Sequence, residues 1–260
     1  MSKQLLLKQS ALKKLSITLL SSLALMAGQA FAINVDEVID ASFENTGGIE
    51  SWSKLKGLKM SIQGIQGPMK FPMEVVQLDD GRTYTQISVQ GKTLKQNVYD
   101  GSTLWNTNFM TMKAEKQSAE AIANMKLTAN DFPSDLLNYK KKGYQAELMG
   151  TEEMDGSEVY KIKLTKEPIT VDGKKVDTVV YYYFDTESMV PLVMENEVKQ
   201  GQGKGMVMLT KFSDYTEVNG FYFPFSMAQS QKGGQQLFSM EVDKIELNPT
   251  VEASAFAFPE

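Results

Sequence analysis

The chemistry available to this chain is narrow, because its 260 residues contain neither histidine nor cysteine. This composition removes the nucleophile systems that pair serine or cysteine with histidine, and it removes metal sites built from imidazole or thiolate. Two kinds of catalysis remain. Pairs among the 32 Asp and Glu residues could act as acid and base on a glycosidic bond, or a lysine could activate a serine.

Neither remaining kind of catalysis finds support in the residue spacing. The segment Ser51-Trp52-Ser53-Lys54 has the Ser-x-x-Lys spacing, but this pattern is common by chance and no Lys-Thr-Gly or Ser-Asp-Asn motif follows. No acid lies within the apolar runs 179–184 and 206–209, where burial would most readily raise its pKa. We therefore expect no catalytic residue, no metal site and no cofactor.

The N-terminal segment has the three parts of a cleavable signal peptide. Lysines at positions 3, 8, 13 and 14 precede an apolar run over 15–26, which ends at Gln29-Ala30-Phe31-Ala32. The run is shorter than the ~20 residues that a membrane-spanning helix needs. We expect cleavage after Ala32, so that 1–32 is a signal peptide and 33–260 is one β domain, exported to the periplasm.

Charge and cysteine content narrow the partners of the exported chain. The whole sequence has a net charge of −5, and the signal peptide removes four lysines and no acid, so the remaining chain is more acidic still. Such a charge disfavours nucleic acid and anionic membrane surfaces as partners. Without cysteine the chain forms no disulfide and carries no lipidated cysteine. We expect a freely diffusing monomer.

Hydrophobic periodicity predicts a mainly β protein with a few helices. Asn34-x-x-Glu37 is a capping box that opens a helix, and a short helix carrying Trp52 follows. From Leu58 onward the period is two, and Asp-Gly and Asn-Gly pairs mark tight turns between about eleven strands. Two inserted helices are predicted between 110 and 143. The expected fold is a strongly curved antiparallel sheet that forms an unclosed half-barrel, with helices covering its concave side or mouth.

Several strands are apolar in a way that one buried face does not explain. The runs 179–184 and 206–209 are apolar on both faces, and Phe221, Phe223, Phe225 and Met227 form one apolar row. Such strands are covered on both sides, or they face an apolar cavity that a ligand fills. Many of the 16 methionines also fall on strands, where a flexible side chain suits either a core or an adaptable cavity wall. Both interpretations remain open.

An ordered set of short motifs resembles the outer-membrane lipoprotein-sorting protein family, the LolA-like periplasmic lipoprotein carriers. The resemblance extends over nearly all of 33–260, and its specificity lies in the order of the motifs. The matching features are Gly47-Gly48 with Trp52, Asp100-Gly101 with Trp105, Gly150-x-Glu152 with Gly156 and Tyr160, Tyr183-x-Asp185, Ser213-Asp214-Tyr215 with Asn219-Gly220 and Pro224, Asn248-Pro249, and Phe256-x-Phe258-Pro259.

The resemblance implies a non-catalytic carrier that shields acyl chains in an apolar cavity. Its cargo would be an acylated lipoprotein or a free lipid, and a membrane transporter or an envelope receptor would be a further partner. Arg82, the single arginine, is the candidate lid anchor, although it could equally be a solvated turn residue. The candidate lipid-cavity residues are Met60, Ile62, Met73, Trp105, Tyr160, Ile162, Tyr181, Tyr183, Phe221, Phe223, Phe225 and Met227.

Two alternative functions fit the same residues. A lipid-sensing accessory protein of an envelope system would need the same cavity, and the hairpin over 167–177 departs from the pattern expected of the housekeeping carriers. A carboxylate-only enzyme acting on envelope polysaccharide is the alternative from another class, and it is disfavoured by the absence of acids from the two-sided apolar strands.

Overall fold

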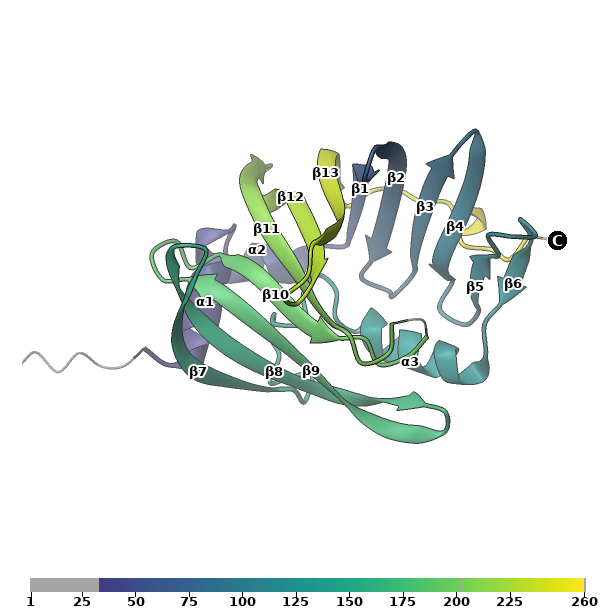
Figure 1. Cartoon of the computed structure of the whole chain (residues 1–260). Coiled ribbons are helices and arrows are strands. Elements are labelled where there is room, and N and C mark those ends of the chain that lie inside the picture. The colour runs from purple at the N-terminus through teal and green to yellow at the C-terminus, as the bar shows by residue number, and fades with distance from the viewer. Residues whose placement is uncertain (1–32, 202, 260) are drawn as a thin grey trace, which may run out of the picture. The chain divides into compact units, whose positions relative to one another are not determined.

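One antiparallel sheet of thirteen strands makes up most of residues 33–201 and 203–259, the part of the chain that this computed structural model describes (Figure 1). The predicted signal peptide, 1–32, lies outside the described residues. The strands are β1 (Gly57–Gln66), β2 (Met69–Leu78), β3 (Thr83–Val89), β4 (Lys92–Tyr99), β5 (Leu104–Thr107), β6 (Ala114–Lys116), β7 (Gln145–Met154), β8 (Ser157–Val171), β9 (Lys174–Asp185), β10 (Pro191–Glu197), β11 (Val207–Val218), β12 (Phe221–Gln231) and β13 (Gln236–Leu247).

The sheet consists of two meanders that meet in its middle. The strand order is β6-β5-β4-β3-β2-β1-β13-β12-β11-β10-β9-β8-β7, so only the β1–β13 pair joins strands that are distant in sequence. Tight turns with positive φ connect neighbours, as at Asp155-Gly156, Asp172-Gly173 and Asn219-Gly220. The prediction of a mainly β, antiparallel fold is confirmed.

The sheet is not closed, as predicted, but the predicted strong curvature is not found. The sheet is open, with β6 and β7 as its edges, and it is not strongly curled. The helix α3 (Ala119–Ala129) contacts β8 near one edge and β5 near the other.

Among the described residues there are three α-helices and one 3₁₀ turn, η1 (Ala253–Ala255). The capping box of α1 (Val35–Asn45) is present, with the Asn34 side chain accepting from the Glu37 N–H and the Glu37 carboxylate accepting from the Asn34 N–H. The short helix α2 (Ile49–Lys54) follows as predicted. α3 confirms the first of the two inserted helices.

The second inserted helix is absent. Residues 131–144, which we call the plug, instead form a series of turns. Asn138 has a φ of 54°, a left-handed conformation that interrupts any helical path through Leu136 and Tyr139. The strands β5 and β6 were also missed, because four and three residues are too few to show a period of two.

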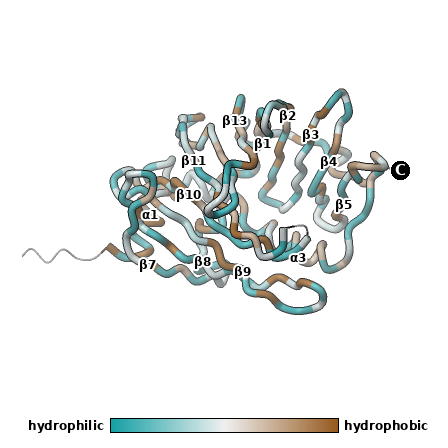
Figure 2. Tube along the Cα trace, in the orientation of Figure 1, coloured by the Kyte–Doolittle hydropathy of each residue, from teal (hydrophilic) through white to brown (hydrophobic). Residues whose placement is uncertain are grey.

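Alternate side chains on each strand point to opposite faces of the sheet, and both faces are covered in part. Figure 2 shows apolar positions interspersed with polar ones along the strands. We call the face that packs against α1, α2 and the plug the inner face; it carries Ile62, Ile162 and Phe223. The outer face of β2 to β5 carries a second cluster, which packs against Phe256 and other residues of the C-terminal segment 251–258.

Phe256 holds the C-terminal segment against the outer face. Its side chain is fully buried, its ring lies 5.5 Å from that of Tyr84, and its carbonyl accepts a hydrogen bond of 3.1 Å from the Trp105 indole N–H. We predict that Phe256→Ala lowers the unfolding free energy by ~3–5 kcal/mol in urea, because burial is lost and a void remains. Phe258→Ala, at a half-buried ring, should cost clearly less. Equal losses in the two variants would contradict this assignment.

Candidate functional site

The middle of the inner face is a continuous apolar surface formed by five neighbouring strands. In the register of the sheet, Ile62 of β1 is paired with Met73 of β2 on one side and with Val242 of β13 on the other. Met73 is paired in turn with Ile87 of β3, and Met240 of β13 with Met227 of β12. Apolar side chains therefore run across the strands without a polar break.

Part of this surface is only half-buried, and we call this part the open stretch. Unlike the buried core beside it, the open stretch has side chains that α1, α2 and the plug do not fully cover, although most of them pack against the edge of the core. Its residues are Met60, Phe71, Met73, Ile87, Phe225, Met227, Phe238 and Met240.

An aromatic pair lies across the far end of the open stretch. The rings of Phe71 and Phe238 stack with centroids 5.9 Å apart, although their strands are separated by β1. The strand between them has Gly64 at this level, where a Cβ would lie 2.6 Å from the Phe71 ring and 2.9 Å from the Met73 sulfur. The missing side chain of Gly64 therefore makes room for the pair.

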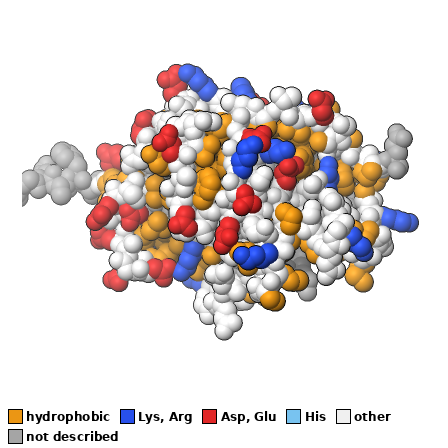
Figure 3. All heavy atoms as spheres, turned by 90° about the horizontal axis from the view of Figure 1, so that it is seen from above, with side chains coloured by type: hydrophobic (Ala, Val, Ile, Leu, Met, Phe, Trp, Pro, Cys, Tyr) orange, Lys and Arg blue, Asp and Glu red, His pale blue; other side chains and the backbone are white. Residues whose placement is uncertain are grey.

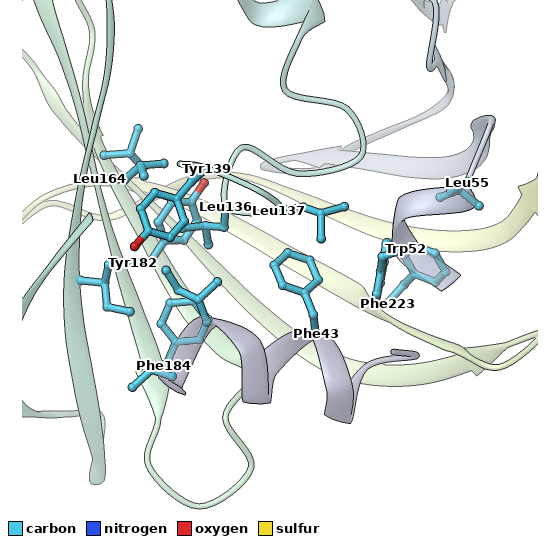
Figure 4. Close-up of a cluster of buried hydrophobic side chains, with 14 of the residues drawn as sticks. Phe43, Trp52, Leu55, Leu136, Leu137, Tyr139, Leu164, Tyr182, Phe184 and Phe223 are labelled. Carbon is cyan, nitrogen blue, oxygen red and sulfur yellow. The ribbon is translucent and has the colours of Figure 1, made fainter. Parts of the chain in front are cut away.

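The other end of the inner face is packed core. Trp52 of α2 lies edge-on to Phe221 and Phe223, with ring centroids 4.9 and 5.2 Å away. Figure 4 shows Phe43 of α1, Trp52 and Phe223 close to Leu137 of the plug. Phe223 therefore packs within this core, and Phe225, the next residue of the row, lies at the boundary of the open stretch.

Three small cavities border the plug. One of about 260 Å³ lies among Phe43, Phe184 and Phe223, one of about 230 Å³ lies beside Arg82 and α3, and one of about 360 Å³ lies beside α1. Pro133 and Ser134 line both of the first two, and Leu136 lines the first and the third. The plug therefore divides the space under the helices into separate cavities, two of which are smaller than the ~300–1,000 Å³ of most ligand sites.

A buried polar cluster ties the plug to the sheet. Lys166 of β8 forms ion pairs with Asp131 and with Asp135, the latter at 3.1 Å. The hydroxyl of Tyr144 donates to Asp131 at 2.9 Å, and that of Tyr182 on β9 donates to Asp135 at 2.7 Å. Each carboxylate thus has both a cationic and a neutral partner, as buried charges require.

The ionisation of the polar cluster follows from its burial. Burial raises the pKa of Asp131 above its usual range, and the positive charge of Lys166 opposes this rise only in part. Burial alone would lower the pKa of Lys166, but the charges of Asp135 and Asp131 outweigh it and hold that pKa above its usual range. Burial also raises the pKa of Tyr182. The lysine is therefore charged at neutral pH and holds two acids in place.

The structure brings most of the predicted cavity residues together. The shared cluster of the inner face and its margin contains Met60, Ile62, Met73, Tyr160, Ile162, Phe221, Phe223, Phe225 and Met227. Whether a lipid contacts them stays a prediction.

Three predicted cavity residues and the predicted lid anchor lie elsewhere. Tyr181 and Tyr183 point to the outer face, because their neighbour Tyr182 points inward and side chains alternate along a strand. Trp105 is also on the outer face, under the C-terminal segment. Arg82 lines the cavity of about 230 Å³, but its ion-pair partner is Asp80 of the same turn, at 2.8 Å.

The sequence analysis missed the residues that fix the plug. Lys166 follows Ile162 and Leu164 in the period of two, so alternation along the strand already indicated its inward direction, but the sequence analysis did not single out a lysine at this position. Asp131 lies before Pro133, between the two predicted helices, and Asp135 lies at the start of the segment that was predicted as the second one. The pairing of Phe71 with Phe238 was also missed, because it depends on the β1–β13 contact between distant parts of the chain.

The fold is similar to several solved structures. A LolA superfamily protein from Nitrosomonas europaea is 13% identical, with 87% of this chain and 98% of that chain covered at a TM-score of 0.51. A domain assigned as an outer membrane lipoprotein-sorting protein, from Vibrio parahaemolyticus, is 12% identical, with 85% and 94% covered at 0.51. A DUF1329 family protein from Desulfovibrio piger is 12% identical, with 86% and 97% covered at 0.52.

These comparisons show that the fold of this chain is similar to that of solved LolA superfamily and lipoprotein-sorting proteins. The resemblance inferred from the ordered motifs is thereby confirmed at the level of the fold. No family model matches the sequence, and no curated protein matches it. At 12–13% identity the likeness establishes the fold alone. Among the described residues, no helix is long and apolar enough to cross a membrane.

The polar cluster makes a prediction about stability. Lys166→Met should lower the unfolding free energy by ~3–5 kcal/mol at pH 7, because it leaves two buried acids without their cation. The loss should shrink at pH 4, because Asp131, whose pKa is already raised, takes up a proton and no longer needs a partner. Urea unfolding at the two pH values measures both effects.

The matched control is Lys163→Met on the same strand. Lys163 is paired with Glu147 on the surface, so this variant should leave the unfolding midpoint nearly unchanged. If Lys166→Met were as mild as Lys163→Met, the polar cluster would not be what holds the plug.

Proposed function

We propose that this chain is a periplasmic, non-catalytic carrier that shields the acyl chains of a lipid or a lipoprotein against the inner face of its sheet. The observation that carries the proposal is the open stretch, an apolar surface that continues the core but lacks a full cover. A half-buried surface with four methionines, Met60, Met73, Met227 and Met240, still leaves apolar area in water and suits flexible alkyl chains.

The size of the surface supports an acyl chain as the ligand. Across the sheet, from Ile87 of β3 to Met227 of β12, four inter-strand spacings of ~4.8 Å cover ~19 Å. An acyl chain spans half of a bilayer's hydrocarbon core, ~15 Å, and so would fit along this length. Each methylene that leaves water contributes ~0.8 kcal/mol, so that affinity needs no specific polar contact.

The plug is the part that would move when cargo enters. Shifting Pro133 and Ser134 would join the cavities of about 230 and 260 Å³, and shifting Leu136 would join the third. The cavities as they stand are too small for a lipid with more than one chain. In this proposal the polar cluster keeps the plug closed in the empty protein, the role first assigned to Arg82.

The described clusters of acids give no support to the enzyme alternative. Asp131 and Asp135 lie close together and border a cavity, as a pair of catalytic carboxylates would. However, both are bound by Lys166, and each accepts a tyrosine hydroxyl, so their oxygens are engaged in holding the plug. This arrangement favours a binding protein over a hydrolase.

Binding of a fluorescent fatty acyl probe tests the proposal. Met73→Gln and Met240→Gln should each weaken binding by roughly tenfold, which corresponds to ~1.4 kcal/mol, because a polar amide then faces the alkyl chain. Their unfolding free energies should change by less than ~1 kcal/mol, since both side chains are half-exposed. Met149→Gln, at an exposed position on the edge strand β7, is the matched control and should bind like the unaltered protein.

Phe223→Ala shows the contrast with packed core. It should lower the unfolding free energy by ~3–5 kcal/mol through the lost contacts with Trp52 and Phe221. The proposed site would be refuted if the unaltered protein did not bind the acyl probe saturably. It would also be refuted if Met73→Gln and Met240→Gln bound the probe as tightly as Met149→Gln.

The Phe71–Phe238 pair makes a prediction about chain length. Because the stacked rings lie across the end of the open stretch, Phe71→Ala should lengthen the available surface. A competition series of fatty acids should then shift its optimum to longer chains in Phe71→Ala. Leu237→Ala, at the exposed neighbour of Phe238, should leave the optimum in place. An unchanged optimum in Phe71→Ala would show that the pair does not limit the chain.

A further inference from the structure

The turn between β5 and β6 presents apolar side chains to solvent. In this turn, residues 108–113, Phe109 is 62% exposed and Met110 is 91% exposed. These are the two most exposed large apolar side chains among residues 33–201 and 203–259. They lie on the outermost hairpin of one edge of the sheet, away from the plug and from the open stretch.

The turn is built to hold these side chains in place. The Asn108 side-chain oxygen accepts hydrogen bonds from the N–H groups of Met110 and Thr111, at 2.8 and 3.0 Å. The Asn108 N–H donates to the Lys113 carbonyl at 2.8 Å, and the Met112 N–H donates to the Asn108 carbonyl at 2.9 Å. These hydrogen bonds within the turn fix its backbone. Phe109 and Met110 are therefore exposed on an ordered turn.

The residue types are unusual for such a turn. Met112 has a φ of 60°, in the left-handed region that Gly and Asn adopt most easily. Most other left-handed residues in the turns of this chain are glycine, asparagine or aspartate, as at Asn219-Gly220. Met112 therefore departs from what the turn geometry favours, and residues held in such conformations are more common at functional sites.

The charges around the turn are mainly positive, although the chain as a whole has a net charge of −5. Lys113 and Lys116 on the hairpin and Lys92 on the neighbouring β4 are exposed, and Glu115 is the acid among them, held by the Asn108 amide at 2.9 Å. Figure 3 shows many acidic side chains at the end that carries α1 and β7, acidic and basic ones mixed across the middle, and mostly basic ones at the end that carries β4 to β6. The net negative charge of the whole chain therefore does not describe this end of the sheet, where lysines outnumber acids around the turn.

We propose that the 108–113 turn inserts Phe109 and Met110 into the surface of a membrane that contains anionic lipids. A narrow convex tip suits lipid better than protein, because a stable protein interface buries ~800 Å² on each partner and two side chains supply far less. The membrane interface accepts single apolar side chains, and flanking lysines add attraction to anionic headgroups. This inference does not depend on the proposed acyl carrier function.

Vesicle flotation tests the inference, using residues 33–260, which form a compact unit of their own. The protein should float with vesicles of phosphatidylethanolamine and phosphatidylglycerol, and binding should fall as salt is raised. The double variant F109S/M110S should bind at least tenfold more weakly. M206S, which removes an exposed methionine near β11, is the matched control and should bind as before. Lys113→Glu should weaken binding to the anionic vesicles.

The outcomes separate the alternatives. M112G should raise the melting temperature, since it removes a left-handed methionine, and this shows that the turn can be altered without unfolding the domain. Absence of flotation by the unaltered protein, equal flotation of F109S/M110S and M206S, or binding to phosphatidylcholine vesicles that is insensitive to salt would each overturn the proposal. Loss of a crosslinked protein partner in F109S/M110S, without vesicle binding, would assign the turn to a protein interface instead.

Discussion

A sheet with apolar side chains on both faces must be covered twice, and this constraint governs the structure of the described chain. The C-terminal segment covers the outer face of β2 to β5, where Phe256 is its fully buried contact. On the inner face, α1, α2 and the plug supply the cover. The inner cover is shorter than the sheet. It ends where Trp52 of α2 packs on Phe223 of β12, and the methionines of the strands beyond this contact are only half-buried.

The incomplete cover explains why the plug is held by charges. The plug buries Leu136, Leu137 and Tyr139 but borders three cavities, so its packing is less dense than that of the core around Ile162. Lys166 compensates by binding two of its acids. A segment held by a few ion pairs can switch between a bound and a released arrangement when those pairs break and form again. Such a switch suits a cover that must admit a ligand.

The sequence predicted elements well where local signals agree and poorly where distant contacts decide. The capping box at Asn34 and Glu37, the strands Met69–Leu78 and Thr83–Val89, and the Asp-Gly turns follow from neighbouring residues alone. The plug was taken for a helix because Leu136, Leu137 and Tyr139 have helical spacing, while the left-handed Asn138 and the pull of Lys166 on Asp135 have no local signature.

The candidate site shows the same division between local and distant information. The period of two places Phe221, Phe223 and Phe225 on one face of the sheet. Which of these residues are packed in the core depends on where α2 ends. Tyr181 and Tyr183 were assigned to the wrong face because a run that is apolar throughout carries no sign of direction. The pairing of β1 with β13, which places Phe238 beside Phe71, joins the two ends of the domain and cannot be read from either segment.

Methyl NMR with labelled methionines would test the central claim most directly. A spin-labelled fatty acid is added to the protein, and the broadening of each methionine methyl signal is measured. If the open stretch holds the acyl chain, Met60, Met73, Met227 and Met240 broaden strongly, while Met149 and Met206 on the exposed surface stay sharp. Broadening confined to Met149, Met206 and other exposed methionines, or no broadening at saturating probe, would contradict the account.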